Sequence, residues 1–231
     1  MRLVLCCGDA VTGRPAAPWQ HRPSDAAAGW QGSALRAVLV SLLLIGALLG
    51  ISRLQRPMVR LHGTPLTAER APDFSGLLDT QGRRFSWQAE RGRAVLVFFG
   101  YTHCPDVCPL TLSALRQSLD RMGPLRRNVR VIFVSLDPVR DTPAVLHAYL
   151  DAFIPDAVGL RGPLQDVAQS ARQWGISWRR VNTTHGDYWI DHTAAVTLVG
   201  PRGHLRARYG YGQLADPAWL AADLHAMLAR P

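Results

Sequence analysis

Lysine is absent from this sequence. All 26 basic residues are arginine, against 17 acidic residues, which gives a formal net charge of +9. We attribute the missing lysine to the codon bias of a GC-rich genome rather than to function. The arginines are scattered from Arg2 to Arg230, with no run and no interleaved aromatic residues, which argues against nucleic-acid binding. The positive charge is compatible with an anionic lipid surface or an acidic partner.

Cysteine is also scarce, with four in 231 residues, too few for a disulfide framework in a chain of this size. Cys6 and Cys7 lie in the segment 1–33, which is rich in Ala, Gly, Pro and Arg without an apolar period and predicts a disordered tail. Cys104 and Cys108 therefore form the one pair of chemical interest. Internal repeats are lacking too, and the length predicts one domain with appendages.

Charge is missing from one long stretch, AVLVSLLLIGALLGI at 37–51. If Arg36 and Arg53 extend from its ends toward water, the stretch grows to 34–54 and is long enough to cross a hydrocarbon core of about 30 Å. A cleaved signal peptide is the alternative, but the preceding segment is long and no small-x-small cleavage site follows cleanly. We therefore expect a single transmembrane anchor at 34–54, followed by a polar linker at 55–70.

The remaining residues, 71–231, predict one α/β domain. Its first feature is a hairpin at 73–88 that turns at Thr80-Gln81-Gly82. Two apolar strands, 94–99 and 129–135, enclose a helix that starts near Pro109, a connection that makes neighbouring strands parallel. Later elements are helices from Thr142, at 163–174 and from Asp216, a strand at 176–181, and a hairpin of 194–199 with 204–209. This order predicts a thioredoxin-like fold with an N-terminal β-hairpin.

The cysteine pair lies in FFGYTHCPDVCPLT, where a proline follows each cysteine. Proline disfavours helical backbone in the residue before it, so 104–108 is predicted to be a loop, with Pro109 opening the next helix. Amide donors and the positive end of the helix dipole favour thiolate over thiol at such a place. Thiol–disulfide exchange, thiol peroxidase chemistry and metal binding all fit this pair.

A third ligand distinguishes metal binding from exchange, because two thiolates with an imidazole can hold copper whereas exchange needs no imidazole. Among eight histidines, His192 is the candidate because its loop should face the cysteine loop, where ordinary thioredoxins place a cis-proline. His103 and His185 are weaker rivals. We expect Asp191 to orient the imidazole and Asp137 to flank the same mouth.

With these residues in place, the sequence resembles the Sco/SenC family of copper chaperones for cytochrome c oxidase assembly. The resemblance covers about 70–231 and rests on APDF, AVLVFFGYTHCPDVCPLTL, VSLDPVRDTP, VGLRG and YWIDHTAAVTLVGPRG. It implies a membrane-anchored thioredoxin fold whose copper ion, Cu(I) or Cu(II), is held by Cys104, Cys108 and His192. It also implies a chaperone without catalytic residues that delivers copper to the binuclear copper centre of cytochrome c oxidase subunit II.

The resemblance further implies a place in the bacterial inner membrane, with the domain in the periplasm; a mitochondrial homologue is the alternative. Other copper chaperones or thiol reductants are expected as partners. A second hypothesis is a thiol–disulfide oxidoreductase in which Cys104 and Cys108 cycle between dithiol and disulfide and reduce the oxidase cysteines before metallation. A zinc site of two cysteines and one histidine is a third option, although no catalytic carboxylate beyond Asp191 is evident.

Overall fold

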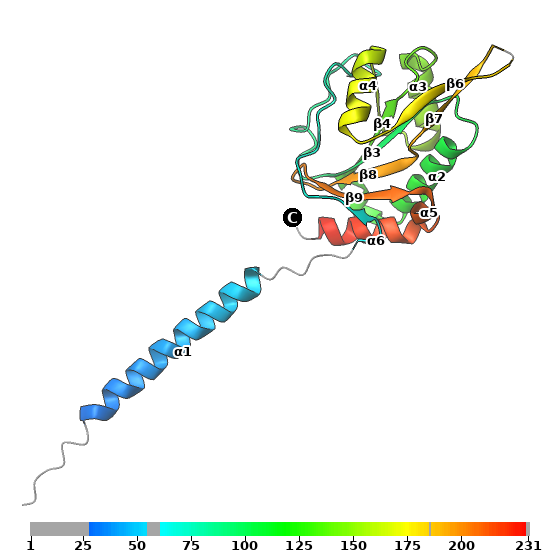
Figure 1. Ribbon diagram of the computed structural model, residues 1–231. Helices are drawn as coiled ribbons and strands as arrows, with labels where there is room; N and C mark the ends of the chain where they lie inside the picture. Colours follow the sequence, from blue (N-terminus) through cyan, green and yellow to red (C-terminus); the bar gives the residue numbers. More distant parts are fainter. Residues whose placement is uncertain (1–27, 55–60, 185, 230–231) are drawn as a thin grey trace, which may run out of the picture. The chain divides into compact units, whose positions relative to one another are not determined.

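The computed structural model describes residues 28–54, 61–184 and 186–229. They belong to two units: helix α1 (Ala28–Leu54) forms the first, and the other elements form the second (Figure 1). Residues 28–33, predicted as part of a disordered tail, belong to α1, whereas 1–27 lie outside the described residues. Within the described part of the chain, no helix is long and apolar enough to cross a membrane. The anchor at 34–54 therefore stays a prediction.

The second unit is built on a seven-stranded sheet with the order β1-β9-β8-β3-β4-β5-β2. Its strands are β1 (Thr64–Pro65), β2 (Leu78–Asp79), β3 (Ala94–Gly100), β4 (Val129–Ser135), β5 (Val158–Arg161), β8 (Ala195–Val199) and β9 (Leu205–Gly210). β4 lies parallel to both β3 and β5, whereas β8 runs antiparallel to β3 and to β9. The predicted parallel unit and the predicted final hairpin are both confirmed.

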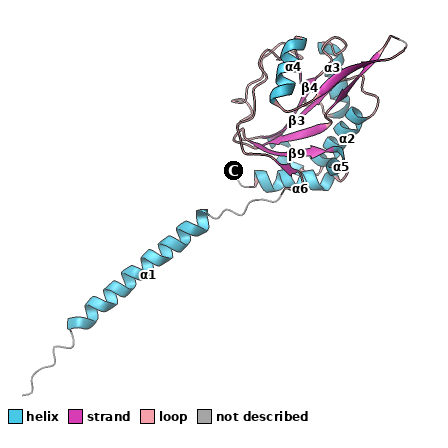
Figure 2. Ribbon diagram, in the orientation of Figure 1, coloured by secondary structure: helices cyan, strands magenta, loops and turns pink. Residues whose placement is uncertain are grey.

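Helices cover both faces of this sheet (Figure 2). They are α2 (Val107–Asp120), the 3-10 helix η2 (Gly123–Asn128), α3 (Pro143–Phe153), α4 (Leu164–Gln173), α5 (Tyr211–Leu214) and α6 (Pro217–Leu228). β3 is buried along its whole length, and successive side chains point to opposite faces. Phe98 contacts Phe133, which packs toward Tyr149 of α3, whereas Phe99 packs toward Trp174 at the end of α4. The α/β thioredoxin-like prediction is thereby confirmed.

The ordered domain begins inside the segment predicted as linker. β1 pairs with β9, and the residues just before it are bound to α6. The backbone N–H of His62 and its Nδ1 atom each lie 2.8 Å from the carboxylate of Asp223, which also accepts a 2.6 Å hydrogen bond from Tyr209. A strand of two residues has no hydrophobic period, so the sequence gives no sign of it.

The predicted N-terminal hairpin is only partly formed. Its turn is present, because the Asp79 N–H donates to the Arg83 carbonyl at 2.8 Å and Gly82 adopts a positive φ of 78°. One bridge, Leu78 to Arg84, extends it, and β2 pairs instead with β5. The later aromatic residues turn toward the core, where Phe85 and Trp87 surround Phe74. The partial burial of these two rings against the core takes the place of pairing in a second hairpin strand.

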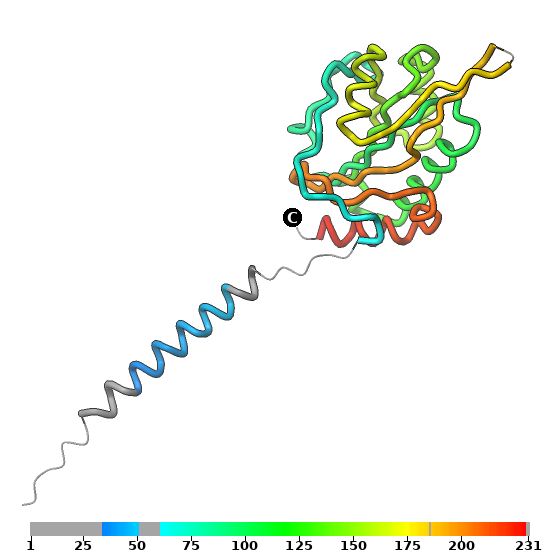
Figure 3. Tube along the Cα trace, viewed as in Figure 1, coloured from blue at the N-terminus to red at the C-terminus, as the bar shows by residue number. Residues whose placement is uncertain are grey.

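A second, two-stranded sheet occupies the region predicted as a short strand followed by a long loop. β6 (Trp178–Asn182) and β7 (Tyr188–His192) pair antiparallel, with Trp178 opposite His192. This β6–β7 hairpin projects from the body of the domain (Figure 3). His192 is thus the last residue of a strand, not part of a loop. Because Tyr188, Trp189 and Ile190 are strand-forming residues but number only three, and a strand signal needs a run of about four to eight, β7 does not stand out in the sequence.

Candidate metal centre

The cysteine loop passes into α2 earlier than the prolines suggested. α2 begins at Val107 with Asp106 as its N-cap, so Cys108 and Pro109 both lie in its first turn. The prediction that 104–108 is entirely loop is therefore wrong for its last two residues. The first backbone N–H groups of a helix have no intrahelical acceptor, so the N–H that proline lacks costs no hydrogen bond there. The N–H of Cys108 instead donates to Cys104 Sγ at 3.4 Å.

The two cysteines differ sharply in their exposure. Cys108 is 0% exposed, whereas Cys104 is half-buried. Gly100, the last residue of β3, makes room for the buried thiol: a Cβ atom there would lie 2.9 Å from Cys108 Sγ and 3.0 Å from the Phe133 ring. The sequence reasoning missed this glycine, although a glycine at the end of an apolar strand is a known sign of close approach.

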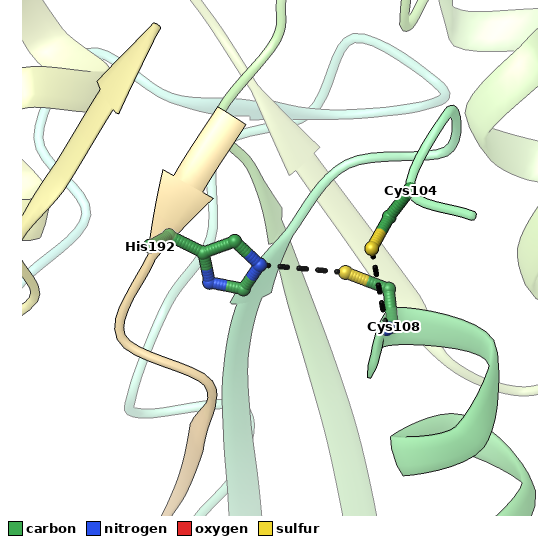
Figure 4. Close-up of side chains that lie close together, drawn as sticks. All are labelled: Cys104, Cys108 and His192. Carbon is green, nitrogen blue, oxygen red and sulfur yellow. Dashed lines mark hydrogen bonds between the residues drawn. The ribbon is translucent and has the colours of Figure 1, made fainter. Parts of the chain in front are cut away.

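His192 completes the group from the end of β7 (Figure 4). Its Nε2 atom lies 3.5 Å from Cys108 Sγ, and its Nδ1 atom lies 3.2 Å from the Thr193 carbonyl oxygen. Because a carbonyl oxygen only accepts hydrogen bonds, we assign the ring proton to Nδ1, which leaves the lone pair of Nε2 directed at the sulfur atoms. The ligand atoms of Cys104, Cys108 and His192 all lie within 4.8 Å of one another.

The pKa values of the two thiols are shifted in opposite directions. The hydrogen bond from Cys108, aided by the backbone N–H groups of Asp106 and Cys108, lowers the pKa of Cys104 to about 3. The same hydrogen bond, together with burial, raises the pKa of Cys108. Burial also raises the pKa of the neighbouring Tyr101 to about 12. At neutral pH the accessible Cys104 is therefore the thiolate, and the buried Cys108 keeps its proton.

The carboxylate of Asp191, which was expected to orient the imidazole of His192, pairs with an arginine instead. It is 3.0 Å from the guanidinium of Arg179 on β6, and the side chain of Asp191 is exposed. The contact to the second ring nitrogen of His192 comes from the carbonyl of Thr193. A backbone carbonyl can fix a histidine tautomer as a carboxylate does, and the sequence offers no sign of which will do so.

Asp137 acts on the hairpin that carries His192. Its side chain is 3% exposed and accepts hydrogen bonds from the Tyr188 hydroxyl, at 2.8 Å, and from Arg140 Nε. Arg140 also donates to the Tyr188 carbonyl at 3.1 Å, and its guanidinium carbon lies 3.7 Å from the centre of the Tyr188 ring. We call Asp137, Arg140 and Tyr188 the hairpin clamp, because they hold β7 against the loop that follows β4.

The rival histidines do not join the group. His103 Nδ1 lies 3.0 Å from Thr102 Oγ1 and 3.9 Å from Asp141. His103 thus contacts its neighbour Thr102 and lies near the fully buried carboxylate of Asp141. His185 lies outside the described residues. Of the described histidines, only His192 belongs to a group of three possible metal ligands.

A cavity of about 340 Å³ opens beside the cysteine loop. Cys104, His192, Tyr101 and Val107 are among the residues that line it, but Cys108 is not. Trp189, on the opposite side of β7 from His192, contributes to its rim and is 48% exposed. An incoming molecule therefore reaches Cys104 and His192 before it reaches Cys108.

The donor set suits a soft metal ion. Two sulfur atoms and one imidazole nitrogen, with no carboxylate oxygen in the group, are ligands of Cu(I), and the same set can hold Cu(II) or Zn²⁺. Three ligands leave room for one from a partner, and the cavity provides the approach. The arrangement can thus both bind a metal ion and release it by ligand exchange.

Comparison with known proteins identifies the family. The SCO1/SenC family profile matches residues 64–229, which include every residue of the group. The chain belongs to the SCO1/SenC family. The mitochondrial SCO2 homologue of Bos taurus is 33% identical over 220 residues, which cover 90% of this chain and 78% of that protein. The mitochondrial SCO1 homologue of Homo sapiens is 30% identical over 214 residues, 86% of this chain and 70% of that protein.

Solved structures agree with this membership. Copper-bound ScoI of Bradyrhizobium japonicum aligns with a TM-score of 0.60 at 35% identity, covering 71% of this SCO1/SenC chain and 98% of that one. Apo Sco1 of Thermus thermophilus aligns with a TM-score of 0.63 at 34% identity, covering 74% and 98%. The Sco/SenC resemblance expected from the sequence is confirmed.

Proposed function

We propose that this SCO1/SenC protein is a metallochaperone that carries one copper ion on Cys104, Cys108 and His192 and passes it to a partner. The observation that carries the proposal is the convergence of these three ligand atoms within 4.8 Å, beside a cavity open to a partner. Copper is the metal to expect here, because the donors are soft and the related ScoI of Bradyrhizobium japonicum binds copper.

Copper binding would use the two thiols in sequence. Cys104 is already a thiolate and can bind the ion first, at the accessible side of the group. Cys108 then loses its proton as it coordinates, because a metal ligand must be deprotonated. The neutral imidazole of His192 supplies the third ligand through Nε2. A partner ligand entering through the cavity would replace Cys104 or His192 first, and Cys108 would be the last to release the ion.

The recipient that we propose is the binuclear copper centre of cytochrome c oxidase subunit II. Its support is family membership, because Sco proteins are a family of cytochrome c oxidase assembly proteins.

We also propose that the apolar segment 34–54, which forms most of α1, anchors the chain in a bacterial inner membrane with the domain in the periplasm. The resemblance to Sco proteins supports this orientation, because it implies that the copper group and the proposed recipient centre face the same side of the membrane.

A second candidate function, reduction of a partner disulfide, is favoured by one observation: the accessible cysteine is a thiolate and the second thiol lies beside it. Cys104 would attack a partner disulfide, forming a mixed disulfide and releasing one partner thiolate. Cys108 would then lose its proton and attack Cys104, releasing the second partner thiolate and leaving Cys104–Cys108 oxidised. Both functions use the same pair, so bound copper and the disulfide exclude each other.

The His192→Ala variant separates the two functions. We expect the purified, reduced full-length variant to lose tight Cu(I) binding in competition with a chromogenic Cu(I) chelator. Its rate of reducing a model disulfide should stay close to that of the unchanged protein, because exchange needs only the thiols. His103→Ala is the matched control and should retain both properties. Unchanged copper affinity in His192→Ala would contradict the proposed ligand set.

A further inference from the structure

A second cavity lies at the other end of β3 from the cysteine loop. It has a volume of about 80 Å³ and is lined by Val95, near the start of β3, and by the turn Gly200–Gly203 between β8 and β9. A seven-residue strand rises about 3.3 Å per residue, so the two ends of β3 lie about 20 Å apart. This cavity is therefore separate from the candidate metal centre.

Positive charge dominates the lining. It contains four arginines, Arg70, Arg91, Arg93 and Arg202, and one acidic residue, Glu90. The Glu90 carboxylate is mostly buried and already balanced, since it lies 3.1 Å from Arg93 and 3.5 Å from Arg130. The lining thus carries an uncompensated positive charge.

Three of these arginines have no counterion in the part of the chain that the structure describes. Many arginines of the domain make ion pairs, such as Arg83 with Asp79 and Arg126 with Asp156. By contrast, the guanidinium groups of Arg70, Arg91 and Arg202 make no hydrogen bond, ion pair or ring contact among the described residues. Their convergence on one small cavity leaves a place for an anion.

Backbone hydrogen bonds bring the three arginines together. They come from three separate segments, and two of these segments are tied to the turn that carries Arg202. The Ala71 N–H, next to Arg70, donates to the Gly203 carbonyl at 2.9 Å, and the Gly92 N–H, next to Arg91, donates to the Pro201 carbonyl at 3.0 Å. The fold itself therefore places the three segments beside one cavity, which lowers the entropic cost of gathering their arginines around a ligand.

We propose that this cavity, the arginine cavity (Arg70, Arg91, Arg93 and Arg202), binds a phosphate group. Guanidinium groups donate paired hydrogen bonds that match the oxygens of a phosphate, and three unpaired ones can serve the several oxygens of one group. A lipid headgroup and free phosphate share this chemistry. If the phosphate belongs to a lipid, the end of β3 that carries the cavity faces the lipid surface. The cysteine loop, at the opposite end of β3, then faces away from the lipid and stays accessible to a partner. The inference is independent of the copper proposal.

Hydrogen exchange of the full-length, reduced protein tests the site. The readout is the exchange rate of amides in 199–206, which contain the turn, with and without inorganic phosphate at ionic strength matched with chloride. A parallel arm compares nanodiscs of phosphatidylcholine with nanodiscs that also contain phosphatidylglycerol. We expect the phosphate group to slow exchange in a saturable way. The double variant Arg91→Gln, Arg202→Gln should lose this slowing.

The double variant Arg84→Gln, Arg127→Gln is the matched control, because it removes the same charge at two exposed arginines outside the cavity. Slowing by phosphate alone assigns the site to free phosphate, slowing only in anionic nanodiscs assigns it to a lipid headgroup, and either result supports the site. The proposal is overturned if neither ligand slows exchange, or if the control variant loses the effect as fully as the cavity variant. Unaltered copper stoichiometry in both variants checks that they fold.

Discussion

The cysteine loop and the β6–β7 hairpin supply the same candidate site from very different surroundings. The cysteines follow β3, whose seven residues are all buried, and Cys108 is itself fully buried. His192 ends a five-residue strand in which only Ile190 is buried. The core therefore fixes the sulfur atoms, whereas the position of the imidazole depends on a few contacts that hold a hairpin against the domain.

This difference separates the two proposed activities. Thiol chemistry needs only the part of the site that the core fixes, while copper binding also needs the hairpin in place. Substitutions near Cys108 should affect both activities, and substitutions in the hairpin clamp should affect copper alone.

Cys108→Ser should abolish both activities. The substitution removes a sulfur ligand from the buried side of the group and also the thiol that would resolve a mixed disulfide. We expect no copper to remain on the variant after gel filtration with a competing Cu(I) chelator. The double variant Cys6→Ser, Cys7→Ser is the control and should keep its copper. Full retention of copper by Cys108→Ser would show that Cys108 is not a ligand.

Arg140→Gln should weaken copper binding while thiol reactivity stays the same. The guanidinium group of Arg140 contacts both the carbonyl oxygen and the ring of Tyr188. Tyr188 precedes His192 on the same strand. Loss of groups that support ligands typically costs about 10- to 100-fold in metal affinity. Chelator competition measures the affinity, and alkylation of Cys104 measures the thiol.

The control for the hairpin clamp is Arg116→Gln, which breaks an exposed ion pair with Asp120 on α2 and an exposed hydrogen bond to the Phe153 carbonyl, both outside the clamp. Exposed pairs contribute little, so this variant should resemble the unchanged protein. Equal losses in both arginine variants would contradict a specific role for the clamp, as would a parallel loss of Cys104 reactivity in Arg140→Gln.

Gly100→Ala should destabilise the domain by crowding the buried thiol of Cys108. The added methyl group would lie 2.9 Å from Cys108 Sγ, and overpacking of this kind costs about 1–3 kcal/mol. Chemical denaturation measures the loss, with Gly82→Ala as a contrast in which strain comes from a positive φ rather than from crowding. Copper affinity and thiol reactivity should both change in Gly100→Ala, and an effect on neither would mean that the pocket around Cys108 is looser than the structure indicates.

Cys104 should stay reactive in acid. Its folded pKa is lowered to about 3, so it remains a thiolate far below the pH at which an ordinary thiol is protonated. In a protein lacking Cys6 and Cys7, the alkylation rate of Cys104 should be nearly constant from about pH 8 to pH 5, whereas the rate for N-acetylcysteine falls about tenfold per unit below its pKa. Mass spectrometry of the modified peptide gives the rate. A slope equal to that of the free thiol would contradict the charge assignment.

The sequence predicts best what depends on local pattern. β4 matches its predicted bounds, and β3 differs from the prediction by one residue, because an uncharged apolar run between turn residues is a strong signal of a buried strand. The cysteine pair and its association with the start of a helix also follow from local spacing. The sequence predicts the start of α2 two residues late, because proline is typical of the opening residue of a helix but is tolerated elsewhere in the first turn.

Features that depend on distant contacts were predicted less well. The β7 strand is stabilised by its pairing with β6 and by the hairpin clamp, neither of which leaves a period in the sequence. The tautomer of His192 depends on the Thr193 carbonyl, a backbone group that no sequence motif marks. His192 itself was selected by reasoning about the fold, and the structure places its ring beside Cys108 as that reasoning expected.

X-ray absorption of the copper-loaded, reduced full-length protein identifies the copper ligands themselves. We predict that the scattering shell around Cu(I) contains two sulfur atoms and one nitrogen, with the nitrogen contribution missing in His192→Ala. A shell of sulfur alone in the unchanged protein, or a nitrogen contribution that survives in His192→Ala, would contradict a site built from Cys104, Cys108 and His192.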